Sequence, residues 1–258
     1  KEQRTALINH AVTKGLNYDV DFKDSGIEWI GEIPEHWEAI SLRRLLTVLT
    51  DYDANGSFSS IKDNVKRVDN ESDRYAWFVR ATDLESLNRN EEDDKVWVDE
   101  QTYNYLSKSK LYGGEILIAK RGEIGKIYRM PFVNYPCSLA PNLYLIRMVE
   151  KVKTDYLFYF LSSSYGNDQL KIKNNSTTLG ALYKDDLKDI ICILPPLSEQ
   201  QAIIYYLDEQ TAFLDKAITL ETQKIGKLKE YRQSLISAAV TGKICVLPFT
   251  EKEEPKAV

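Results

Sequence analysis

The sequence predicts an α+β fold, in which a globular domain with a β-sheet and short helices is followed by one long coiled-coil helix. Residues 17–194 alternate short apolar runs with Gly, Asn, Asp and Pro, a pattern typical of strands and turns. Residues 195–245 contain no proline after Pro196 and carry apolar residues at heptad spacing, which indicates the long helix. Residues 1–16 repeat the end of this helix, and residues 246–258 are expected to form a flexible tail.

The two ends of the chain are similar in sequence. KEQRTALINHAVTKGL at Lys1–Leu16 and KEYRQSLISAAVTGKI at Lys229–Ile244 share eight of sixteen positions without a gap, at an offset of 228 residues. This period is far too long for a solenoid. We therefore interpret residues 1–16 as the end of an equivalent helix that belongs to a preceding copy of a domain-sized module.

Five segments rich in β-branched and aromatic residues are predicted to form strands. They are Tyr75–Leu84, Lys95–Glu100, Gly114–Gly122, Lys126–Val133 and Asn142–Val149. A short helix is predicted at Asp155–Ser163, because apolar residues recur there at helical spacing behind an acidic first turn.

The long helix is predicted to run from about Ser198 to Thr241. Ser198 and Gln201 have the spacing of a capping box after the diproline, and Gly242 supplies a stop. Such a helix would be on the order of 65 Å long, so burial of one end would not stabilise it. We expect it to pair with a helix of similar length through a heptad seam. The seam residues are Ile204, Leu207, Leu214, Ile218, Ile225, Leu228 and Leu235.

Composition excludes several classes of protein. No run of about eighteen apolar residues and no signal-peptide pattern occur, so neither a membrane span nor secretion is expected, and the cytoplasm is the default location. The net charge of −5 argues against bulk electrostatic coating of nucleic acid but allows local basic patches. Cys137, Cys192 and Cys245 are widely spaced, which favours buried thiols over disulfides or a zinc site.

Several motifs together resemble the specificity subunit of Type I restriction-modification systems. They are SGIEWIGEIPEHWE at Ser25–Glu38, then WFVRATDL, LYGGEILIAKRGEIGKI, SLAPNLYLIR and LPPLSEQQAIIYYLD, in the order found in that family. The resemblance implies one target recognition domain at residues 17–194 and its spacer helix, without catalysis in this chain. It implies double-stranded DNA as ligand, with this chain reading one half of a bipartite target. A full subunit of that family has two recognition domains, so a second recognition half or a second copy is expected to pair through the long helix.

The same resemblance implies two kinds of enzymatic partner. Methyltransferase subunits would carry S-adenosylmethionine, nuclease and translocase subunits would carry ATP and Mg²⁺, and this chain would bind no cofactor itself. The residues agree with a non-catalytic role: there is no methyltransferase signature and no paired-carboxylate motif for a metal or nuclease site. His10 and His36 are the only imidazoles, and we interpret both as structural.

AKRGEIGK at Ala119–Lys126 is the first candidate DNA-binding segment. It lacks the Ser or Thr of a P-loop and the third glycine of a Rossmann motif. A tight turn between two strands explains its glycines equally well. For Lys120, Arg121 and Lys126 we favour DNA contact, because cations beside a glycine turn can approach phosphates or a guanine edge.

Two polar segments supply the other candidates. In residues 50–67, Tyr52, Asn55 and Ser59 are predicted to contact bases, and Lys62 and Lys66 the DNA backbone, although a mobile surface loop explains the segment as well. In residues 171–187 an ordinary connection is nearly as probable as a DNA-binding loop. The candidates there are Lys173, Asn174, Ser176 and Thr178.

Two functions from different classes follow. The first is a DNA sequence-recognition subunit that also scaffolds the methyltransferase and nuclease subunits. The alternative is a coiled-coil adaptor whose globular domain binds protein rather than DNA, which the heptads support equally well.

Overall fold

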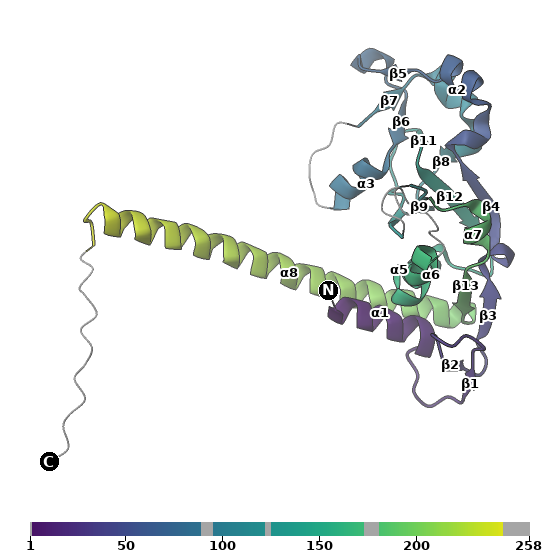
Figure 1. Ribbon diagram of the computed structural model, residues 1–258, viewed down its shortest axis with the longest axis horizontal. Helices are drawn as coiled ribbons and strands as arrows, with labels where there is room; N and C mark the ends of the chain where they lie inside the picture. Colours follow the sequence, from purple (N-terminus) through teal and green to yellow (C-terminus); the bar gives the residue numbers. More distant parts are fainter. Residues whose placement is uncertain (1, 89–94, 122–124, 173–180, 245–258) are drawn as a thin grey trace. The chain divides into compact units, whose positions relative to one another are not determined.

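The computed structural model describes residues 2–88, 95–121, 125–172 and 181–244 (Figure 1). The chain divides into two compact units, residues 1–208 and residues 209–258. The predicted tail at 246–258 and Cys245 lie outside the described residues. The predicted α+β class is confirmed, since a sheet-containing domain is followed by a long helix, α8 (Leu197–Val240).

A four-stranded antiparallel sheet forms the centre of the first unit. Its strand order is β10 (Ile127–Arg129), β9 (Ile116–Ala119), β12 (Leu143–Met148) and β4 (Leu46–Asp51). All four residues of β9 are buried, which shows that this strand is covered on both faces. β9 and β10 pair antiparallel on either side of the glycine segment, of which residues 122–124 lie outside the described residues.

A second sheet has five strands. Its order is β5 (Arg67–Val68), β7 (Trp97–Val98), β6 (Ala76–Val79), β11 (Cys137–Leu139) and β8 (Lys110–Leu111), and only the β6–β11 pair is parallel. The two sheets share one apolar core, which contains Trp77 and Val79 of β6 together with Leu117 of β9 and Leu145 of β12.

Helices cover the opposite face of the four-stranded sheet. Ile116, Ile118, Tyr144 and Ile146 alternate with the residues that face the second sheet, as the two-residue period of a strand requires. They join a core that includes residues of α1 (Glu2–Lys14), α5 (Thr154–Ser162) and α6 (Ser164–Ile172). Two small ladders complete this side: β1 (Phe22–Asp24) with β2 (Glu32–Pro34), and β3 (Glu38–Ser41) with β13 (Ile191–Leu194).

The first turns of α8 belong to the same core. Ile203, Ile204 and Leu207 are buried in it beside Ile8 and Val12 of α1, and the two helices run in opposite directions there (Figure 1). The predicted helix at residues 198–241 is thus confirmed within one residue at each end. The Gln200 amide fixes its start, because Nε2 donates to Lys151 O and Pro195 O while Oε1 accepts from Lys153 N.

All five predicted strands are shorter in the structure, and two of the predicted segments run into helices. Tyr75–Leu84 is a strand only at Ala76–Val79, because α3 (Ala81–Asn88) begins where Asp83 accepts from Arg80 N at 3.0 Å and from Trp77 Nε1 at 3.0 Å. Lys95–Glu100 is a strand only at Trp97–Val98, because Asp99 caps the next helix, α4 (Glu100–Tyr105).

The polar segment at residues 50–67 also folds into regular structure. A 3₁₀ turn, Tyr52–Asn55, is followed by α2 (Phe58–Asn64), whose first turn is capped by Ser57. A further helix, α7 (Lys184–Lys188), precedes β13. The 3₁₀ turn and α2 follow the end of β4, and residues of both line the candidate site.

Candidate DNA interface

A cavity of about 610 Å³ brings together segments that are distant in the sequence. We call it the basic cavity. It is lined by Tyr52, Asp53, Gly56, Phe58, Ile61, Lys62, Lys120, Arg121, Pro141 and Asn142. Four of these residues, Tyr52, Lys62, Lys120 and Arg121, are predicted DNA-binding residues.

Strand register explains this convergence. Asp51, at the end of β4, is paired with Tyr144, and Ala119, at the end of β9, is paired with Leu143 at the start of β12. The residues that follow β4 and β9 therefore emerge at the same edge of the sheet. The backbone tightens this edge, because Lys120 N donates to Asn142 O at 2.7 Å.

Lys120 is held by two carboxylates. Its Nζ lies 2.8 Å from Asp51 Oδ2 and 2.5 Å from Asp53 Oδ2, while Lys184 Nζ lies 2.9 Å from Asp51 Oδ1. Burial alone would raise the pKa of Asp51, but hydrogen bonds and charge from the two lysines outweigh it and lower that pKa. Burial alone would lower the pKa of Lys120, yet the hydrogen bonds and charges of the two aspartates raise it. Lys120, with only 17% of its side chain exposed, therefore ties the strand ends together.

Two other predicted residues also have partners inside the domain. Lys126 Nζ lies 2.8 Å from Glu85 Oε1, and this oxygen also accepts from Tyr128 Oη at 2.7 Å. The Asn55 amide donates to Tyr52 O and Ser109 Oγ and accepts from Lys108 N. Asn55 thus stabilises the turn at the cavity.

Three predicted cations point to solvent. Lys62, Lys66 and Arg121 are exposed, and their side chains have no hydrogen-bond or ion-pair partner in the part of the chain that the structure describes. Ser59 is exposed and lies beside Ser57, with 3.1 Å between their hydroxyls. Tyr52 is half-buried, and its ring packs edge-on against Phe78. Lys173, Asn174, Ser176 and Thr178 lie outside the described residues.

Sequence reasoning did not single out six residues of the basic cavity, Phe58 and Asn142 among them. Phe58 is 86% exposed at the start of α2, and Asn142 has a positive φ of 75°. An aromatic residue in a polar segment was the available signal for Phe58. Asn142 follows Pro141 in a turn, and asparagine is among the residues that tolerate a left-handed backbone.

The predicted helix-pairing residues separate into two groups. Ile204 and Leu207 are buried in the core of the first unit. Leu214, in the second unit, is half-buried. The others are exposed in the second unit: Ile218, Ile225, Leu228 and Leu235.

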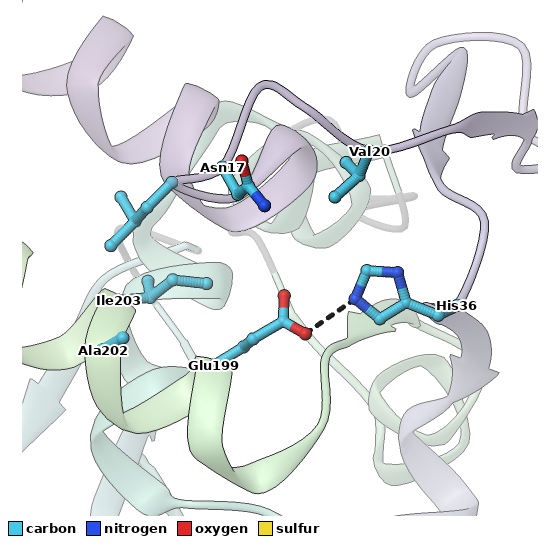
Figure 2. A pocket seen from close by; sticks show the side chains of 7 residues that line it. Asn17, Val20, His36, Glu199, Ala202 and Ile203 are labelled. Carbon is cyan, nitrogen blue, oxygen red and sulfur yellow. Dashed lines mark hydrogen bonds and ion pairs between the residues drawn. The ribbon is translucent and has the colours of Figure 1, made fainter.

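A second cavity, of about 520 Å³, lies beside the start of α8 and is mostly apolar (Figure 2). His36 Nε2 lies 2.7 Å from Glu199 Oε1, and Trp37 Nε1 donates to Glu199 Oε2 at 2.9 Å. Figure 2 shows the Glu199 carboxylate directed at the imidazole. This geometry joins the start of α8 to the residues between β2 and β3.

The cysteines in the described part of the chain are buried, and no cluster of metal ligands occurs there. Burial raises the pKa of Cys137 to about 12 and also raises the pKa of Cys192. Among the described residues, no three His, Cys, Asp or Glu side chains gather as metal ligands. Within the same residues, no helix combines the length and the apolar character that crossing a bilayer requires.

The fold has counterparts among solved proteins. A chain from a type I R-M system, solved to explain complex assembly and conformational transition, aligns with a TM-score of 0.60 at 17% identity. The alignment covers 92% of the present chain and 52% of the solved one. The HsdS subunit from Thermoanaerobacter tengcongensis aligns with a TM-score of 0.56 at 19% identity, and the alignment covers 94% of the present chain and 52% of that subunit. These likenesses establish a shared fold.

Sequence comparison agrees with the fold. The putative type I restriction enzyme MjaX specificity subunit of Methanocaldococcus jannaschii is 23% identical over 247 residues, which are 94% of this chain and 51% of that protein. The chain thus spans about half the length of this relative. The family model described as "Type I restriction modification DNA specificity domain" matches residues 37–230, which is more than half of the chain. The chain therefore belongs to the Type I restriction modification DNA specificity domain family.

Proposed function

We propose that this chain reads one half of a bipartite DNA target, as the non-catalytic recognition subunit of a Type I restriction-modification complex. The observation that carries the proposal is the basic cavity, where Lys62 and Arg121 are exposed, have no side-chain partner among the described residues, and lie near the ion pairs of Lys120. In this role, phosphate contacts by the cations would set the position of the domain on the duplex, and base contacts would supply selectivity.

The net charge is compatible with this role. A chain with a charge of −5 is repelled by DNA as a whole, so binding depends on local cations and on partners that complete the clamp. Lys120 and Lys126 attract DNA less than their positive charges alone would suggest, because each forms an ion pair with a carboxylate. We therefore expect weak binding by the isolated chain.

The long helix is proposed to pair with a second recognition half or with a second copy of this chain. The repeat supports this pairing. Ile8 and Val12 of α1 are 7% and 0% exposed in the core of the first unit, whereas their counterparts at the offset of 228, Ile236 and Val240, are 44% and 81% exposed. The apolar residues that are buried in the N-terminal copy of the repeat are thus exposed in the C-terminal copy. This is the expected state of a helix end that would pack against an equivalent domain of a partner.

The enzymatic partners remain part of the proposal. Methyltransferase subunits would bring S-adenosylmethionine, and nuclease and translocase subunits would bring ATP and Mg²⁺. The complex would act on host DNA in the cytoplasm. For this chain we propose a scaffold role, in which the globular domain and α8 bind those subunits.

Reconstitution tests the proposal. The chain would be assembled with the modification subunits of its host, and the methylated sites would be mapped on genomic DNA. We expect methylation at one split sequence in the presence of the chain and none in its absence. Assembly that proceeds normally while the Lys62→Ala/Arg121→Ala variant methylates the same sites at the same rate would favour a protein-binding adaptor instead.

A further inference from the structure

Phe58 occupies an unusual position for a phenylalanine. It is 86% exposed, although burial of such a side chain is generally worth about 1.5–3 kcal/mol. A single exposed apolar side chain needs no explanation on a mobile loop. Phe58, however, begins a short helix that several contacts hold in place.

Contacts within the domain hold α2 in place. Ile61, on the same helix, is only 8% exposed. Ser60 Oγ lies 2.8 Å from Tyr105 Oη, and this hydroxyl approaches Gly56 so closely that a Cβ there would collide with it. Phe58 is thus exposed on a helix that other residues anchor.

The surroundings of Phe58 distinguish it from another exposed phenylalanine. Phe132 is 81% exposed, but its ring lies against Gly113 and Gly114, where a Cβ would meet it. Phe58 instead lines the basic cavity together with Lys62 and Arg121, whose cationic groups have no partner among the described residues. An exposed apolar side chain that lines a cavity together with two exposed cations matches a ligand that has both anionic and apolar groups.

DNA presents that combination where phosphates flank the 5-methyl group of thymine in the major groove. A phenyl ring has no hydrogen-bonding group, so it gives no preference for guanine or cytosine edges, and apolar contact with the methyl group is its known form of base readout. We propose that Phe58 is a specificity-determining residue that contacts a thymine methyl group, with Lys62 and Arg121 on the adjoining phosphates. This inference rests on the proposed function.

The test uses the complex of the full chain with its modification subunits and duplexes that carry the mapped target. Affinity is measured for target and scrambled duplexes at several salt concentrations. Phe58→Ala should lower the ratio of target to scrambled affinity about tenfold, in line with the loss of one base contact, and leave the salt dependence unchanged. In the wild-type complex, deoxyuridine at one thymine position should cause a similar loss that is absent in Phe58→Ala.

Matched variants separate the possible outcomes. Phe132→Ala should keep the wild-type ratio, and the thermal midpoints of both variants report folding. An unchanged ratio in Phe58→Ala, equal losses in both variants, or no deoxyuridine effect at any thymine would overturn the role of Phe58. A wild-type complex that does not prefer any sequence would instead overturn the proposed function itself.

Discussion

Lys120 and Asp51 form an ion pair, with 2.8 Å between Nζ and Oδ2, at the edge where β9 and β4 end. Asp51 is 5% exposed and also receives Lys184, so one carboxylate joins residues from three separate segments. The pair fixes the shape of the basic cavity. It also explains why the most obvious basic residue of the glycine segment is less available to DNA than its neighbour.

Asp51→Asn is expected to destabilise the first unit. The substitution leaves two lysines near a neutral amide, and loss of a buried charged partner typically costs about 1–3 kcal/mol. Thermal or urea denaturation would measure the change. Asp53→Asn is the matched control, since Asp53 is 64% exposed and exposed pairs contribute about 0–1 kcal/mol. Equal losses in the two variants would contradict the importance of the buried carboxylate.

The free energy of unfolding should depend on pH through Asp51. The pKa of Asp51 in the folded chain is lowered from its usual 3.8, so its contribution is complete above that value and is lost as the pH falls through the folded pKa. The pKa of Lys120 is raised from 10.5, so its contribution is complete below that value and is lost only as the pH rises through the folded pKa. Between these limits the pair should be insensitive to pH.

Denaturation of wild type and Asp51→Asn between pH 2 and 7 would check this dependence. The difference in free energy of unfolding between the two proteins should be constant from about pH 5 to 7 and shrink below about pH 4. A difference that stays constant down to pH 2 would show that the carboxylate keeps its stabilising role when protonated, contrary to the ion-pair interpretation.

Arg121→Ala and Lys62→Ala should weaken DNA binding by the assembled complex without loss of thermal stability. Each removes one exposed cation, so the slope of log affinity against log salt should fall by about 1 per phosphate contact. Fluorescence anisotropy at several salt concentrations would measure it. Lys23→Ala, on β1 outside both large sheets, is the control and should keep the wild-type slope. An unchanged slope in all three variants would remove the basic cavity from the interface.

Ile218→Glu should abolish self-association through the long helix. Ile218 is 55% exposed and occupies a seam position, so a carboxylate there would have to be buried in any helix pair. Light scattering should report a smaller mass for this variant, with unchanged circular dichroism of the folded domain. Lys216→Glu, also exposed but outside the seam, should associate as the wild type does. If Ile218→Glu retained the wild-type mass, the seam would not be the contact.

The long helix could be predicted because its signal is local. Heptad spacing, the absence of proline and a final glycine all lie within the segment, and α8 ends within one residue of the prediction. The segment Tyr75–Leu84 was harder, since its apolar composition favours a strand throughout. Its helix begins because Asp83 binds Trp77 and Arg80, an arrangement that depends on the folded chain.

The sequence predicts which types of residue line the candidate site, but not which of its cations form ion pairs. Lys120 and Arg121 are neighbours with the same charge, yet one is 17% exposed and paired while the other is exposed. Both side chains line the basic cavity, but the carboxylate that binds Lys120 belongs to Asp51, 69 residues away in sequence. Only the register of β4, β12 and β9 brings that carboxylate to Lys120.

The two-sided burial of β9 has a consequence for how new target preferences arise. An insertion of one residue within this strand would exchange its two buried faces and disrupt both cores at once. Phe58 and Arg121 lie outside this strand and line the basic cavity, so changes there leave both cores in place. A change of target preference should therefore occur by exchange of the short segments around Phe58 and Arg121, while the strands of the sheet stay the same. These segments are the natural units to graft between relatives.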